Sequence, residues 1–250
     1  FTVTNLQTPS QMYAMMNVQK GVTADEKVRQ AIQLAIDYKG FLASVLGGNG
    51  HLSTGIVRST VQCSVDTATG EQNVAEAKQL IAEAGAAGKT VTMAYQSTVP
   101  THQKLATLLQ SNLQAIGLNV QLQSVTYPQY LALLQSKDTI PELAVVQDSP
   151  KYPAVGPFLT QHWTTASIGL GNYSAYSNPQ VDQLLAQANS TVDESAACSD
   201  YQQAQKLIAA DRTSANIVAL DISIVARKGI SGITYDPARS LLNVTNIRLS

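Results

Sequence analysis

Side chains that could perform catalysis are few in this sequence and lie far apart. The three histidines, His51, His102 and His162, show none of the spacings of a metal site. No Gly-x-Ser-x-Gly motif supports a nucleophilic serine. The segment GGNG (47–50) follows a predicted helix rather than a strand, which is the wrong context for a phosphate loop. These patterns favour a binding protein over an enzyme, with no metal and no cofactor.

The histidines have plainer explanations. His102 falls in the first turn of a predicted helix, where we expect a surface position. His162 precedes Trp163, and we interpret this pair as an aromatic edge satisfied by its neighbours rather than as a ligand contact.

Hydrogen-bonding residues follow three predicted strands, at 90–96, 118–125 and 142–146. The carboxyl ends of parallel strands share one edge of a sheet, and open α/β sheets bind ligands at that edge. Amide, hydroxyl and aromatic groups suit a polar ligand and are poor for covalent chemistry. We therefore predict a ligand site made of Gln96, Ser97, Thr98, Thr126, Tyr127, Gln147, Asp148, Ser149 and Tyr152.

The predicted elements imply an α/β fold with a mainly parallel sheet flanked by helices. Between residues 73 and 146, hydrophobic periodicity and turn signals predict helix 73–85, strand 90–96, helix 101–117, strand 118–125, helix 127–136 and strand 142–146. Such an alternation with short links predicts parallel strands and right-handed crossovers. The rest of the chain is predicted as strand 1–6, helix 25–48, a long connection over 49–72, helices 179–190 and 195–212, strand 216–227 and an irregular tail.

Composition excludes some partners. Charged residues make up 13% of the chain, about half the usual share, and the net charge is −1. This balance gives no electrostatic case for nucleic acid or an anionic membrane. No apolar run approaches the roughly 20 residues that a membrane-spanning helix needs.

The two cysteines, Cys63 and Cys198, allow two interpretations. They could be unrelated buried thiols, or they could form one disulfide in an exported protein and join a long loop to the start of a helix. We favour the disulfide, which would contribute roughly 4–5 kcal/mol in the chain-entropy model.

Five segments, in order, resemble one protein family. They are DEKVRQAIQLAIDYKGFLASVLGGNG (25–50), EAKQLIAEAG (76–85), LATLLQSNLQAIGLNVQLQSVTYPQYLALL (105–134), NYSAYSNPQVDQLLAQA (172–188) and DYQQAQKLIAAD (200–211). Each segment alone is weak, but five in the same order cover nearly the whole chain. Together they are similar to the family 5 extracellular solute-binding proteins of ABC importers, of the oligopeptide-, dipeptide- and nickel-binding type.

The resemblance implies a periplasmic-binding-protein-like lobe of type II that binds a peptide or similar small polar solute outside the cytoplasm. Family members are about twice this length, with two lobes that close on the ligand. Residues 1–228 then correspond to the carboxyl-terminal lobe with its entering hinge strand, and residues 229–250 return towards a missing first lobe. The implied partners are that lobe and an ABC permease. The implied location is the periplasm or the cell surface, where a full-length member can carry a lipid anchor.

The loop after the third parallel strand departs from the family pattern. Oligopeptide binders tend to have Gly-Trp-x-Ala-Asp-Tyr-x-x-Pro there, and the acid pairs with the peptide amino terminus. Alignment through Phe158 places Lys151 at the acid and Tyr152 at the tyrosine, and Asp148 lies three residues early. A lysine that points inward favours an anionic or neutral group, and a lysine on the rim would only be solvated.

Two other function classes are compatible with the sequence. An enzyme on the same lobe fold would bring strongly perturbed titratable groups together in the crevice. A signalling or structural module that has lost ligand binding would fill the crevice with its own side chains.

Overall fold

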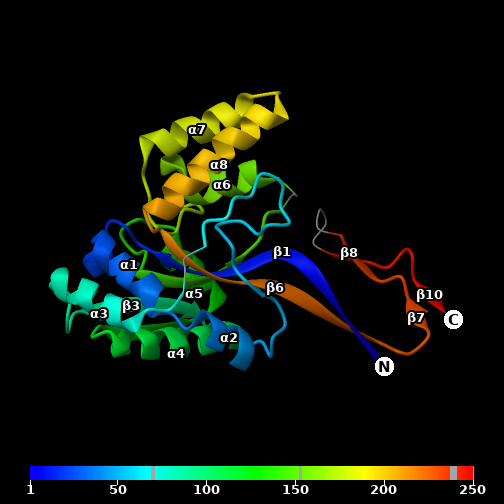
Figure 1. Cartoon of the computed structure of the whole chain (residues 1–250), viewed down its shortest axis with the longest axis horizontal. Coiled ribbons are helices and arrows are strands. Elements are labelled where there is room, and N and C mark those ends of the chain that lie inside the picture. The colour runs from blue at the N-terminus through cyan, green and yellow to red at the C-terminus, as the bar shows by residue number, and fades with distance from the viewer. Residues whose placement is uncertain (69–70, 152–153, 237–240, 250) are drawn as a thin grey trace.

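The fold is built on a six-stranded mixed sheet, which is seen edge-on in Figure 1. The structure is a computed structural model, and it describes residues 1–68, 71–151, 154–236 and 241–249. The strands follow the order β2 (His51–Leu52), β6 (Ser214–Ala226), β1 (Thr2–Met16), β5 (Leu143–Asp148), β3 (Thr90–Gln96) and β4 (Asn119–Val125). Strands β3, β4 and β5 are parallel, and β1 runs antiparallel to both β5 and β6. The predicted β-α-β-α-β succession and the predicted fold class are thus confirmed.

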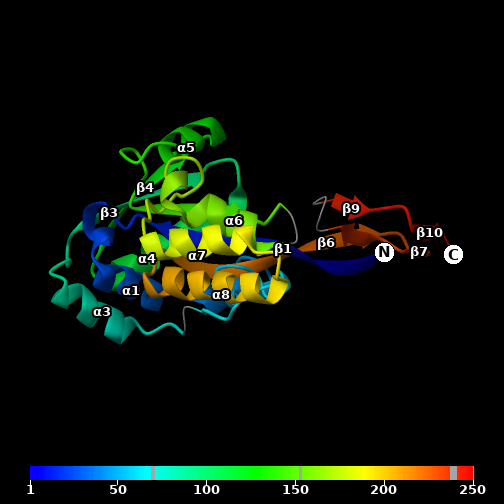
Figure 2. The same ribbon diagram turned by 90° about the horizontal axis from the view of Figure 1, so that it is seen from above.

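Helices cover both faces of the sheet. One face carries α1 (Glu26–Ala35), α2 (Tyr38–Ser44), α3 (Val74–Glu83) and α4 (Pro100–Ala115). The other face carries α5 (Tyr127–Leu134), α6 (Val155–Trp163), α7 (Pro179–Ser190) and α8 (Glu194–Ala210). Figures 1 and 2 show α6, α7 and α8 on the opposite side of the sheet from α1, α3 and α4. Short 3-10 turns lie at Gly21–Ala24 and Thr165–Ser167.

The alternation of side chains along the strands produces two hydrophobic cores. In β1, Met12 and Met16 point into the core beneath α1 to α4, whereas Tyr13 and Met15 point into the core beneath α5 to α8. Successive residues of a strand face opposite sides of the sheet. A strand buried on both faces therefore has a continuous apolar run, which the sequence shows at YAMM (13–16).

The predicted single helix over 25–48 is wrong. Ile36 and Asp37 leave the helical conformation, and the Asp37 carboxylate accepts a hydrogen bond from the Gly40 amide at 2.8 Å. The Asp37 amide in turn donates to the side chain of Asn112 on α4 at 2.9 Å. An aspartate can thus cap a new helix inside a helical pattern, and a tertiary contact holds this break.

Strands β1 and β6 leave the lobe as a two-stranded ribbon (Figure 1). Strand β1 is much longer than the predicted 1–6, and the pairing register shifts between Gln7 and Gln11, where three residues of β1 face Leu220. Pairing with β5 begins only at Gln11, so the segment before it pairs with β6 alone. The bulge marks the place where the buried sheet ends and the exposed ribbon begins.

The tail after β6 contains two short antiparallel strand pairs where an irregular segment was predicted. Strand β7 (Ile230–Ser231) pairs with β10 (Arg248–Leu249), and β8 (Thr234–Asp236) pairs with β9 (Leu241–Asn243). Both views place these strand pairs beside the ribbon and away from the helices (Figures 1 and 2).

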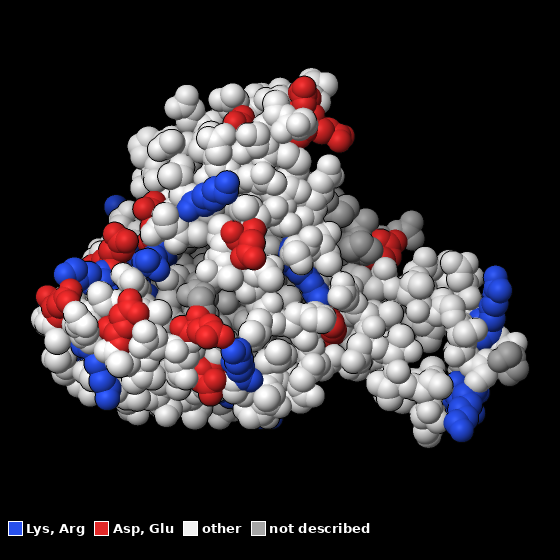
Figure 3. Space-filling model, in the orientation of Figure 1, with Lys and Arg blue, Asp and Glu red and all other residues white. Residues whose placement is uncertain are grey.

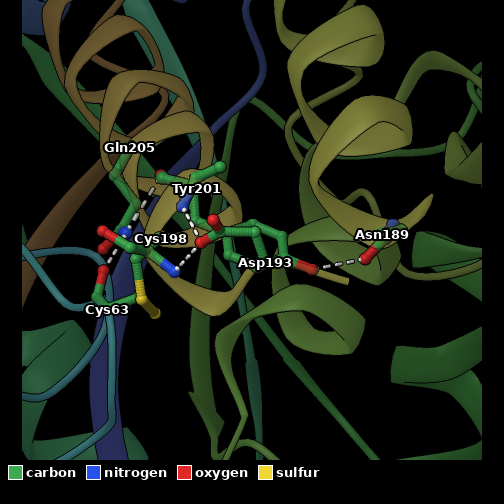
Figure 4. Close-up of a disulfide and its surroundings, with 8 residues drawn as sticks. Cys63, Asn189, Asp193, Cys198, Tyr201 and Gln205 are labelled. Carbon is green, nitrogen blue, oxygen red and sulfur yellow. Dashed lines mark hydrogen bonds between the residues drawn. A yellow bond between two sulfur atoms is a disulfide. The ribbon is translucent and has the colours of Figure 1, made fainter. Parts of the chain in front are cut away.

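Cys63 and Cys198 form a disulfide (Figure 4). Their Cα atoms are 5.0 Å apart, and the bond joins residues 135 positions apart in sequence. It ties the connection between β2 and α3 to the first turns of α8, where the Asp193 carboxylate caps the helix by accepting hydrogen bonds from the amides of two following residues. The Gln205 side-chain amide nitrogen Nε2 donates to the Cys63 carbonyl at 2.9 Å and anchors the same loop.

Candidate functional site

The described residues of the predicted site lie where the parallel strands end. Gln96 is level with Val125 in the β3–β4 register, and the Ser97 amide donates to the Val125 carbonyl at 2.8 Å. Strand β5, which ends at Asp148, lies on the other side of β3. The loops after β3, β4 and β5 therefore share the carboxyl edge of the sheet. Tyr152 lies outside the described residues.

The loop after β4 leads directly into α5, and its first residue caps that helix. Thr126 caps α5, with its amide 3.0 Å and its hydroxyl 2.8 Å from the Gln129 side-chain oxygen. The hydroxyl is therefore committed to the helix. The next residue, Tyr127, has 53% of its surface exposed. Both predicted ligand residues are exposed to solvent, and they differ in that the Thr126 side chain caps the helix.

Asp148 ends β5 in contact with a residue of α6. One carboxylate oxygen accepts the Ser149 amide at 2.7 Å, and the other lies 3.2 Å from Nε2 of His162. The Asp148 side chain is 32% exposed, whereas that of His162 is 4% exposed. The carboxylate therefore faces the edge of the sheet with the imidazole behind it.

Aromatic rings surround this imidazole. Ring centroids lie 4.6 Å from His162 for Phe158, 5.7 Å for Trp163 and 6.0 Å for Tyr173. Burial raises the pKa of Tyr173, and the charge of Asp148 adds to the effect. The structure agrees with an aromatic surrounding for His162, and it also adds the contact with Asp148.

Helix α6, which supplies this cluster, was not predicted. Its inward residues Val155, Phe158, Leu159, His162 and Trp163 have helical spacing. This signal was present in the sequence, but Pro153 and Pro157 made the segment resemble a continued loop. Tyr173 carried no comparable signal, because only the fold brings it to α6.

Two buried tyrosines lie close to Asp148. The Tyr13 hydroxyl donates to the Ile56 carbonyl at 3.1 Å, and the Tyr130 hydroxyl donates to the Val145 carbonyl at 2.6 Å. Burial raises both pKa values far above the ordinary value of tyrosine, and the Asp148 charge acts in the same direction. These hydroxyls stay protonated near neutral pH and cannot act as bases.

The surface position predicted for His102 is wrong, because the residue is only 2% exposed. Its position in the first turn of α4 is correct, but it belongs to the stripe that also buries Leu105, Leu109 and Leu113. Burial lowers the pKa of His102, and nearby Gln147 partly opposes this. Within the described part of the chain, no hydrogen bond of normal geometry reaches either ring nitrogen.

The ribbon leaves the lobe at the same carboxyl edge. Asp148 is paired with Gln11, the first β1 residue after the bulge. The connection after β2 supports this junction, because the buried Arg58 side chain donates to the carbonyls of Thr8 and Leu220 at 2.6 and 3.0 Å. The ribbon therefore leaves the lobe beside the predicted ligand residues.

The surface is mostly uncharged on the face drawn in Figure 3, in keeping with the low charge content. Among the described residues, no helix is long and apolar enough to cross a membrane. Nor does the described part of the chain gather three or more histidine, cysteine or acidic residues at a common metal site.

Comparisons with known proteins connect this geometry to a family. The model of the bacterial extracellular solute-binding proteins, family 5 Middle, matches residues 2–169. The chain is 26% identical over 228 residues to a probable D,D-dipeptide-binding periplasmic protein of Escherichia coli K12, covering 90% of this chain and 44% of the relative. It is 31% identical over 216 residues to the periplasmic murein peptide-binding protein of the same organism, covering 80% of this chain and 39% of that protein.

A solved structure shows the same fold. The crystal structure of a dipeptide binding protein from Pseudoalteromonas sp. SM9913 in complex with Met-Leu matches with a TM-score of 0.85 at 23% identity. The match covers 100% of this chain and 50% of the other. The chain thus spans less than half the length of the two curated relatives.

Proposed function

The chain belongs to the family 5 bacterial extracellular solute-binding proteins, and we propose that it is the carboxyl-terminal lobe of the solute-binding component of an ABC importer. The observation that carries this proposal is the shared edge. Uncharged hydrogen-bonding loops and the half-exposed Asp148 lie at the same edge from which β1 and β6 leave the lobe. A second lobe at the end of that ribbon could close on a solute held there.

The proposed solute is a peptide or a similar small polar molecule. Relatives named for peptides support this class, as do the amide and hydroxyl groups of Gln96, Ser97 and Gln147. The buried tyrosines near Asp148 are hydrogen-bond donors rather than bases, which favours binding over catalysis. The proposed location is outside the cytoplasm, and the proposed protein partner is a permease.

We also propose the division of the chain between this lobe (1–228) and a segment that returns to a first lobe (229–250). Val3 and Val225 are paired across the ribbon and are 67% and 64% exposed. Leu241 and Leu249 of the tail are 63% and 83% exposed. Exposed apolar side chains on the ribbon and the tail fit surfaces that another part of the protein covers.

Native mass spectrometry of the protein isolated from its source tests the assembly and the ligand together. A mass near twice the 26.6 kDa of this chain, with a small adduct, would support a two-lobed binder and weigh the solute. A protein of 26.6 kDa without an adduct would favour a self-standing structural or signalling module.

A titration of this chain by NMR tests the location of the site. Alanyl-alanine at millimolar concentration should shift the resonances of the loops after β3, β4 and β5. Tyr127→Ala should weaken these shifts. The matched control is Val192→Ala, which changes a residue that is 96% exposed and outside these loops. Equal effects of the two variants, or shifts confined to other regions, would contradict the proposed site.

A further inference from the structure

The disulfide lies against the first turn of α6. Cys63, Cys198 and the first three residues of that helix line the same small hollow of about 170 Å³. The residue before Cys63 is also tied to this place by its backbone, because Gln62 forms a parallel β-bridge with Ala154, the residue that precedes α6. A displacement of Cys63 would therefore be passed to the start of α6.

The same bridge holds one end of the loop after β5. The other end is Asp148, which is paired with Gln11 in the sheet. Only five residues, 149–153, lie between Asp148 and Ala154. A span of this length has a limited reach, since each residue covers at most about 3.6 Å. The position of Ala154 therefore limits where this loop, with the predicted ligand residue Ser149 at its start, can lie.

The connection between β2 and α3 contacts the ribbon as well as this loop. Arg58 donates to the carbonyls of Thr8 and Leu220, where β1 and β6 leave the sheet. Gln62, which bridges to the start of α6, is only four residues further along the chain. The segment 58–63 thus sets the spacing between the ribbon and the loop after β5, and the disulfide is at its end.

The backbone of Cys63 has a conformation that its surroundings impose. Its φ angle is 63°, in the left-handed region that a residue with a Cβ rarely adopts. Such a conformation persists when the surrounding structure determines it. The bond to Cys198 in α8 is one such restraint, and the hydrogen bond from the Gln205 side chain to the Cys63 carbonyl is another (Figure 4). Loss of the bond removes the covalent restraint from the residue next to Gln62.

We propose that the disulfide positions the solute site, acting through Cys63 and Gln62 on the start of α6 and on the loop after β5. This inference rests on the proposed function. The effect is separate from the chain-entropy contribution, which acts on the unfolded chain and leaves the folded protein as it is. Loss of the bond should therefore change the folded protein at α6 and lower its affinity for the solute.

The change in the folded protein can be measured without a ligand. The chain has no other cysteine, so a dithiol reduces this bond alone. Reduction should accelerate hydrogen exchange more at Leu159 and Thr160, whose amides belong to the first hydrogen-bonded turn of α6, than at the amides of β3. The comparison is made in sucrose, which favours the folded state. Equal acceleration at α6 and β3 would mean a uniform loss of stability and would overturn the proposal.

The effect on binding is measured by titration with alanyl-alanine. Reduction should weaken its affinity by about 2- to 30-fold, the range of couplings through networks of contacts. The control is Ile81→Ala, which leaves a cavity in the opposite hydrophobic core. It should lower stability but leave the affinity unchanged. Equal affinities of the oxidised and reduced proteins would refute the positioning role.

A second variant keeps the bond and removes only its connection to the loop. Insertion of one glycine between Gln62 and Cys63 preserves the disulfide but separates it from the bridge to Ala154, so it should reproduce the weaker binding and the faster exchange in α6. Wild-type affinity and exchange in this variant would contradict the proposal even if the reduced protein does not fold. If alanyl-alanine perturbs the carboxyl edge in neither redox state, the peptide proposal fails and the role in binding fails with it, while the exchange comparison still decides whether the bond holds α6.

Discussion

Arg58 and Asp221 form a buried ion pair at the junction of the lobe and its ribbon. The guanidinium Nη2 lies 2.9 Å from the carboxylate Oδ1, and the two side chains are 4% and 8% exposed. The same guanidinium donates to the Thr8 carbonyl in the bulge of β1. His51, whose ring is 56% exposed, approaches the other Asp221 oxygen at 3.2 Å. One arginine therefore fixes both strands where they leave the sheet.

Removal of the Arg58 side chain should destabilise the folded protein. Arg58→Met leaves a buried carboxylate with only an exposed histidine beside it, and should lower the free energy of unfolding by about 3–5 kcal/mol. Chemical denaturation measures the change. The control is Lys39→Met, which removes an ion pair with Glu71 whose side chains are 74% and 83% exposed, and which should have no measurable effect. Similar losses in both variants would contradict the role of burial.

His102 should make the protein less stable in mild acid. Burial lowers its pKa in the folded state, while the unfolded chain has the ordinary value of about 6.5. Below that pH the unfolded state binds more protons than the folded state. The free energy of unfolding therefore decreases as the pH is lowered, by at most about 1.4 kcal/mol per pH unit, until the folded ring also protonates. His102→Leu should reduce the loss between pH 7.5 and 5.5. Equal losses in the variant and the wild type would show that other groups cause the effect.

Reduction of the disulfide should destabilise the chain. Because Cys63 and Cys198 are 135 residues apart, the chain-entropy model predicts a loss of about 4–5 kcal/mol. Unfolding with and without dithiothreitol measures it. A double variant, Cys63→Ser with Cys198→Ser, should be unaffected by the reductant, and its free energy of unfolding should equal that of the reduced wild type. An oxidised protein no more stable than this variant would show that the bond does not constrain unfolding.

Replacement of Gly156 by a larger residue should destabilise the protein, because Tyr201 and Asn189 lie against its Cα. A Cβ there would collide with the Tyr201 hydroxyl and come within 2.8 Å of the Asn189 side-chain oxygen, which accepts a hydrogen bond from that hydroxyl. Gly156→Ala should cost about 1–3 kcal/mol, and Tyr201→Phe, which removes the colliding oxygen, should recover part of it. A double-mutant cycle in chemical denaturation gives the coupling. Additive losses would refute the collision.

Local signals predicted many elements well. Strand β3 and helix α7 have their predicted bounds, 90–96 and 179–190. Both are defined by neighbouring residues, since alternation fixes the strand and the Asn178 side chain caps the helix. The shared carboxyl edge followed from the same signals, because the order of the parallel strands already implied it.

Long-range contacts decided the remaining features. The helix break at Asp37 depends on Asn112 of α4, and the full length of β1 depends on its pairing with β6. The aromatic cluster around His162 depends on Tyr173, which the fold brings to α6. Such contacts leave little pattern within a short window of sequence.

The sequence by itself determined the class of fold, the family and the edge at which the loops after the parallel strands meet, because periodicity, caps and strand order are properties of neighbouring residues. Only the tertiary structure decided the electrostatics of that edge. His162 and Asp148 are separated by a proline-rich loop, and nothing in their spacing reveals that α6 folds back to place them 3.2 Å apart. This contact depends on the position of α6 against the sheet, which the packing of the whole lobe sets.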